Sequence, residues 1–242
     1  MKNILYSIAF SCFATFTFAQ PTTWGIQFSN AIKTRYTPTI NNMTNKGWEY
    51  SNSIITHGME KIYDKTPDAS YLNYIKAYID LYVTAGGGIP SGIISLDKIH
   101  PGISVLFLYE KMKSANNVDT TKYKTAALNL RNILVGPAST YPKTSSGGIF
   151  WHKNNGSYNN IVLLDGVYMA HPFLAKYGRL FNDNAAMDTA INQIQCQANH
   201  PAGSQAGSGN TGCARLFLSS ALKWRYYPLN LIESQEVGLI SM

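Results

Sequence analysis

The stretch ISVLFLY at residues 103–109 carries apolar side chains on almost every side of a helix. A helix of this kind is stable only where protein surrounds it. The next helical stretch, residues 120–134, differs because Tyr123, Ala127 and Leu130 lie on one face and polar residues occupy the other. A fully buried helix followed by a one-sided helix indicates an inner layer of helices that an outer layer covers.

The same alternation occurs on both sides of this pair. Residues 48–65 and 72–83 each carry an apolar stripe, and Thr66-Pro67 between them supplies a helix start. Residues 161–181 are apolar almost throughout, and residues 185–194 are amphipathic again. No stretch is convincing as a strand. The sequence therefore predicts an all-α chain of roughly three hairpins, which could stack as a solenoid or form an incomplete α/α toroid.

The first 19 residues have the pattern of a secretory signal peptide. Lys2 precedes an apolar run from Ile4 to Phe18, and Ala19 is a small residue at the cleavage position. The run is too short to span a bilayer after cleavage, and Cys12 within it lacks a lipobox. We expect a mature chain that starts at Gln20 and is periplasmic or secreted. No later stretch is apolar for long enough to be a membrane helix.

The composition limits the ligands that this chain could bind. It has 16 tyrosines, 14% charged residues and a net charge of +7, and a basic protein can bind nucleic acid, a membrane surface or an acidic small ligand. Export argues against nucleic acid, and the scattered basic residues argue against a polybasic membrane patch. A uronate-bearing ligand remains, beside the alternative that the surface is basic without a ligand. No spacing of Cys or His resembles a metal site, so we expect neither metal nor cofactor.

The last part of the chain, residues 195–242, has a different character. It contains a run rich in glycine and serine, and no acidic residue occurs between Asp188 and Glu233. We expect an irregular segment here, either a linker or the product of a disrupted reading frame. Cys196 and Cys213 could pair in an oxidising compartment, although their place in this segment argues against a structural disulfide.

Three short motifs stand at junctions between a loop and an inner helix: LDKIHPG (96–102), GGIFWHK (147–153) and LDGVYMAHPF (164–173). Asp165 lies within the apolar stretch 161–181, where a buried carboxylate without a function would be costly. Asp97 alone could be a helix-capping acid, and His152 and Lys153 alone could be a solvated loop pair.

Together with Trp48-Glu49-Tyr50, these motifs resemble those of the unsaturated rhamnogalacturonyl hydrolases of glycoside hydrolase family 105, which are related to the unsaturated glucuronyl hydrolases. All four occur in the family's order, and the resemblance covers roughly residues 22–194. It implies an (α/α)6 toroid that binds a 4,5-unsaturated uronic acid at the non-reducing end of a pectin-derived, rhamnogalacturonan-type oligosaccharide. The implied reaction releases this uronic acid by hydration of its double bond and needs no cofactor.

The resemblance also implies a role for each matching residue. Asp165 takes the position of the catalytic acid, which protonates C4 of the uronide and activates water at C5, and Asp97 takes that of an assisting aspartate. The expected substrate-binding residues are Tyr50, Trp151, His152 and Lys153. To donate a proton near neutral pH, Asp165 needs a pKa well above the ordinary value of about 3.9. We expect burial among apolar neighbours and a nearby second carboxylate to raise it.

The sequence also departs from the family pattern. Leu163 stands where the family usually has tryptophan, and the family's later motif W-x-R-x-x-G-W-Y does not follow Ile194. An inactive truncation, or a non-catalytic exported helical module that binds glycans, is therefore the alternative to an active hydrolase. The nucleotide sequence downstream of codon 194 would discriminate, because a truncated enzyme gene would encode the missing motif in another frame.

Overall fold

The computed structural model describes residues 24–43, 46–115, 119–137, 139, 141–144 and 148–199. The expected signal peptide and nearly all of the expected tail lie outside these residues, as does Cys213. The α-helices of the described part are α1 (Trp24–Arg35), α2 (Tyr50–Lys65), α3 (Ala69–Ile79), α4 (Gly102–Ser114), α5 (Thr120–Leu134), α6 (Gly166–Phe181) and α7 (Asn184–Asn199). Short 3-10 helices are η1 (Ile40–Asn42), η2 (Leu96–Lys98) and η3 (Gly156–Tyr158).

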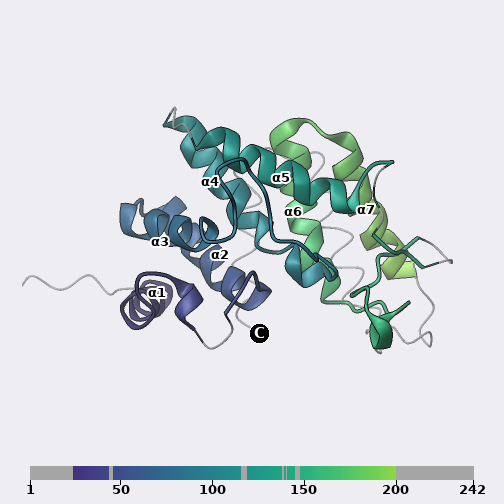
Figure 1. Cartoon of the computed structure of the whole chain (residues 1–242), viewed down its shortest axis with the longest axis horizontal. Helices are drawn as coiled ribbons and strands as arrows, with labels where there is room; N and C mark the ends of the chain where they lie inside the picture. The colour runs from purple at the N-terminus through teal and green to yellow at the C-terminus, as the bar shows by residue number, and fades with distance from the viewer. Residues whose placement is uncertain are drawn as a thin grey trace, which may run out of the picture.

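The helices form three consecutive hairpins, α2–α3, α4–α5 and α6–α7. The first helices of the hairpins pack on one another in the order α2, α4, α6 and form the inner layer, while α3, α5 and α7 lie outside them. Figure 1 shows the arrangement, with α4 between α3 and α6 and with α1 and α7 toward opposite ends of the long axis. The predicted all-helical, two-layer architecture is confirmed.

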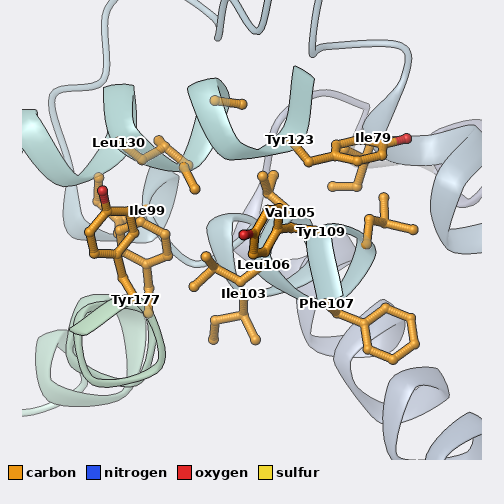
Figure 2. Packing of buried hydrophobic residues seen from close by; sticks show 14 of the residues in the cluster. Ile79, Ile99, Ile103, Val105, Leu106, Phe107, Tyr109, Tyr123, Leu130 and Tyr177 are labelled. Atoms are coloured by element: carbon orange, nitrogen blue, oxygen red, sulfur yellow. The ribbon is translucent and has the colours of Figure 1, made fainter. Parts of the chain in front are cut away.

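Helix α4 is the centre of the hydrophobic core. Its residues 102–109 are all buried, so the helix that is apolar on all sides is also enclosed on all sides. Figure 2 shows Tyr177 of α6, Leu130 of α5 and Ile79 of α3 around the α4 side chains. Burial of one such large apolar side chain contributes about 1.5–3 kcal/mol, so this cluster is a main source of the free energy that holds the three hairpins together.

The inner face of α2 is polar, in contrast to that of α4. Its buried residues include Thr56 and Glu60, which meet Ser104 of α4: the hydroxyls of Thr56 and Ser104 lie 2.9 Å apart, and the Ser104 hydroxyl donates to the Glu60 carboxylate. Burial raises the pKa of Glu60 to about 7, against the lowering effects of Lys176 and the Ser104 hydrogen bond. A buried, titratable carboxylate thus lies between the first two inner helices.

Helix α7 continues to Asn199, five residues beyond the boundary expected at Ile194. The residues directly after that boundary are therefore helical, and those from 200 onward lie outside the described part. No helix in the described ranges is both long and apolar enough to cross a membrane.

The start of α4 depends on a glycine. A β-carbon added at Gly102 would lie 2.7 Å from Cδ2 of Phe173 and 2.9 Å from Cδ1 of Leu130. We expect Gly102→Ala to lower the free energy of unfolding by about 1–3 kcal/mol, because both core side chains must shift.

Gly58→Ala is the matched control: Gly58 lies inside α2 with no atom within 4 Å of such a β-carbon. It should stabilise by up to about 1 kcal/mol. Urea denaturation measures both, and equal effects would contradict the packing argument.

Candidate active site

Paired loop segments place Asp97 beside His152. The backbone N–H of Leu96 donates to the carbonyl of His152 at 3.0 Å, and that of Asn154 donates to Ile94 at 2.6 Å. Ser95 and Lys153 form an antiparallel bridge at the same point. Because these bonds pair the segment before η2 with the segment around His152, two of the sequence motifs become neighbours.

Asp165 comes to the same place from the start of α6, where it is the N-cap residue and makes no capping hydrogen bond with its side chain. The expectation that Asp165 is buried inside a helix is wrong, because α6 begins only at Gly166 and 51% of the Asp165 side chain is exposed. Gly166 permits a close approach: a β-carbon there would lie 2.8 Å from Cδ1 of Leu96 in η2. The helix that follows Asp165 therefore packs directly on the turn that carries Asp97.

His152 lies between the two carboxylates. Its Nε2 is 3.6 Å from Oδ2 of Asp97, and its Nδ1 is 3.5 Å from Oδ1 of Asp165. The imidazole is buried, and its Nδ1 has no hydrogen-bond partner within the described part of the chain. The backbone N–H of His152 donates to Ile161 at 2.7 Å, and its carbonyl accepts from the Tyr141 hydroxyl at 3.2 Å. The structure thus brings these three side chains together, and the loops hold the histidine from both sides.

Asp97, not Asp165, is the more buried of the two aspartates. Burial raises the pKa of Asp97, and the neighbouring carboxylates of Asp165 and Glu49 act in the same direction, while His152 and Lys153 oppose them. The mechanism expected for Asp165, burial plus a second carboxylate, therefore operates on its neighbour. An aspartate with a raised pKa can keep its proton closer to neutral pH than an exposed one.

The segment before α2 joins the site through Lys98. The indole N–H of Trp48 donates to the Lys98 carbonyl at 2.7 Å, and the Lys98 ammonium pairs with the Glu49 carboxylate. Tyr50 begins α2, 39% exposed, at this same end of the helices. Glu49 was not predicted as a site residue, although it stands between Trp48 and Tyr50, because nothing in the sequence shows that its charge acts on Asp97.

The remaining predicted residues lie along the loop that carries His152. The Lys153 ammonium is 5.6 Å from the centre of the Tyr158 ring, and this ring is 6.0 Å from the His152 imidazole. Tyr158 is 40% exposed and was not predicted; its place between two motifs was the only available signal. Trp151 is half-buried, and its indole nitrogen has no hydrogen-bond partner among the described residues.

This geometry suits acid–base chemistry. One carboxylate is exposed and can reach a ligand, the other is half-buried with a raised pKa, and an imidazole lies between them. Two titratable groups in different environments are the usual arrangement for a general acid and its supporting group. The helical hairpins thus form a scaffold that carries a candidate acid–base site at one end.

The comparison with known families agrees with this scaffold. The model of Glycosyl Hydrolase Family 88 matches residues 26–210, well over half of the chain. The chain therefore belongs to Glycosyl Hydrolase Family 88.

Two solved structures share the fold. One is a glycoside hydrolase from family 105 of C. acetobutylicum ATCC 824, with a TM-score of 0.63 and 22% identity over 86% of this chain. The other is a possible member of the GH105 family from Klebsiella pneumoniae subsp. pneumoniae MGH 78578, with a TM-score of 0.55 and 16% identity over 77% of this chain. This chain spans only 61% and 51% of these two proteins. The predicted incomplete (α/α)6 toroid is confirmed by this partial match.

Proposed function

We propose that this protein is an unsaturated uronyl hydrolase, which hydrates the double bond of a 4,5-unsaturated uronic acid at the non-reducing end of a rhamnogalacturonan-type oligosaccharide. The observation that carries the proposal is the Asp97–His152–Asp165 cluster, in which His152 lies 3.6 Å and 3.5 Å from the two carboxylates. Membership of Glycosyl Hydrolase Family 88 and the fold shared with family 105 structures support the same reaction class.

In the proposed reaction Asp165 is the general acid and then the general base. Its carboxylic acid donates a proton to C4 of the vinyl ether, which leaves a cation at C5 that the ring oxygen stabilises. Water adds to C5 and gives its proton to the Asp165 carboxylate, which restores the acid. The resulting hemiketal opens by cleavage of the C5–O5 bond, which gives a ketone at C5 and a hemiacetal at C1. That hemiacetal then collapses to an aldehyde and releases the rest of the oligosaccharide as an alcohol. The exposed position of Asp165 at the start of α6 supports this role, since the group must touch the substrate.

Asp97 and His152 support this proton transfer. A protonated Asp97, with its raised pKa, reduces the negative charge that the carboxylate of the uronide meets. His152 can donate from either ring nitrogen once it is protonated, so it can share a proton with each aspartate. We assign Lys153 to pair with the substrate carboxylate, which would be a charge-assisted contact.

The direct test follows the double bond of an unsaturated rhamnogalacturonan disaccharide by its absorbance in the presence of the purified chain. We expect a slow loss, because this chain spans only 61% and 51% of its two structural neighbours, and a faster loss in a form extended to six hairpins. In heavy water the product should carry deuterium at C4. Binding without any loss of absorbance in both forms would favour the non-catalytic, glycan-binding module instead.

We also propose that the protein acts outside the cytoplasm, because residues 1–19 have the pattern of a signal peptide. N-terminal sequencing of the protein from the native host should begin at Gln20. A start at Met1 in a cytoplasmic fraction would overturn this proposal.

A further inference from the structure

We propose that the Asp97–His152–Asp165 cluster also binds a divalent transition-metal cation of the Zn²⁺ class. These three residues offer ligand atoms that all lie within 4.8 Å of one another. The independent observation is the imidazole: His152 is more than nine-tenths buried, and its Nδ1 faces Asp165 at 3.5 Å without a hydrogen-bond partner among the described residues. A buried polar atom that lacks a partner is costly, and a metal ion would satisfy it.

The three groups can close on one ion by a small movement. Zn²⁺ binds nitrogen and oxygen ligands at about 2.0–2.2 Å, so its ligand atoms lie closer together than these do. His152 is fixed by backbone hydrogen bonds to Leu96 and Ile161. Asp165 is the group that can move, because its side chain is half exposed and makes no capping bond with α6. The ion would then join Nδ1 of a fixed imidazole to an adjustable carboxylate. Asp97 faces the other ring nitrogen, Nε2, at 3.6 Å, so its side chain must also turn to complete the set.

The ligand types select the class of cation. One imidazole with two carboxylates suits Zn²⁺, Cu²⁺, Ni²⁺ or Co²⁺, whereas Ca²⁺ and Mg²⁺ prefer ligand sets made only of oxygen. The local charge agrees, because the carboxylates of Asp165 and Glu49 both act on Asp97 and raise its pKa, so negative charge gathers at this site. The Lys98 ammonium is already paired with Glu49. Sequence spacing did not indicate a metal site because the ligands come from three separate motifs, which only the fold brings together.

A bound ion would block the proposed hydrolase reaction. Asp165 cannot donate or accept a proton while it ligates a metal, and a chelator should restore the reaction. This consequence rests on the proposed function, whereas binding of the metal itself does not. The two proposals can therefore fail separately.

The test uses the purified, EDTA-treated chain without substrate. Calorimetry with ZnCl₂ should show one ion per chain, and Co²⁺ should give visible absorption from a protein-bound site. We expect His152→Gln and Asp165→Asn each to weaken binding by at least about tenfold, since even the loss of a residue that supports a ligand costs about 10- to 100-fold. In the unaltered chain, the NMR signals of the five histidines report the ligand directly: addition of Zn²⁺ should shift those of His152.

Three control variants test whether the effect belongs to this cluster. His57→Gln removes an imidazole from α2, Cys196→Ser removes the free thiol of α7, and Asp68→Asn removes the exposed carboxylate at the N-cap of α3. Each should bind Zn²⁺ as the unaltered chain does. Absence of binding, unchanged binding in His152→Gln and Asp165→Asn, or a loss confined to a control variant would overturn the proposal. So would an NMR shift at another histidine with none at His152.

Discussion

Replacement of Asp165 by asparagine should lower the turnover of unsaturated uronides by about two to four powers of ten, the usual loss when a positioned acid or base is removed. An amide can neither donate the proton to C4 nor take one back from water. The substitution keeps the size of the side chain, and Asp165 makes no capping hydrogen bond with α6, so the fold should not change. Loss of absorbance of the double bond measures the rate, in this chain and in a form extended to six hairpins.

Two further variants calibrate this result. Asp97→Asn should reduce turnover less, because a neutral amide imitates the protonated aspartate that its raised pKa favours. Asp68→Asn, at the N-cap of α3, should leave the rate unchanged because both residue types are good N-caps. If Asp165→Asn retains near-native turnover while Asp97→Asn does not, the two aspartates have exchanged roles. If neither matters, the proposed mechanism is wrong.

The helical architecture could be predicted because the number of apolar sides that a helix carries depends on whether it lies in the inner or the outer layer. A helix enclosed by others must be apolar on every side, and the α4 residues 102–109 are buried as the sequence indicated. The outer helix α3 likewise buries Tyr71, Tyr74 and Tyr78 on one side, as a one-sided packing helix should. Patterns of this kind depend on local sequence alone, so they need no knowledge of long-range contacts.

The site could be predicted only in part. The cluster of Asp97, His152 and Asp165 followed from motifs that each stand at a junction between a loop and an inner helix. The prediction that Asp165 is buried was wrong, because the apolar run begins at Ile161 whereas the helix itself begins only at Gly166. That difference moves Asp165 from a buried helical position to an exposed N-cap. The influence of Glu49 on Asp97 was missed because it arises from a contact between distant segments.

The polar inner face of α2 could not be predicted either, because a polar residue on an amphipathic helix is ordinarily assigned to the solvent side. Glu60 is instead 2% exposed and accepts a hydrogen bond from Ser104 of α4. Its titratable neighbours are His57 on α2, whose Nδ1 lies 3.5 Å from Oε2 of Glu60, and Lys61, Asp64 and Lys176, whose charges act on its pKa. The raised pKa shows that burial outweighs the two lysines, so the neutral carboxylic acid is the form that the fold favours.

This buried acid should make the stability of the protein depend on pH. The pKa of Glu60 is about 7 in the folded chain against an ordinary value of 4.5, so between these values the folded state binds more protons than the unfolded state. The free energy of unfolding should therefore fall as pH rises from about 4.5 to 7, by on the order of 3 kcal/mol, and then level off. Glu60→Gln, which stays neutral and can still accept from Ser104, should remove this fall and should stabilise the protein at pH 8 by a similar amount.

Urea denaturation at a series of pH values from 5 to 8 measures the effect as a shift of the midpoint at constant slope. Asp68→Asn is again the control, because hydrogen bonds to Ser70 lower the pKa of Asp68 and its titration lies below this window. That variant should keep the fall in stability that Glu60→Gln removes. If Glu60→Gln destabilises the protein at pH 8, the carboxylate must be charged and paired in the folded state. The acid between α2 and α4 would then be held by its lysine and histidine neighbours, and burial would not be the dominant influence on its pKa.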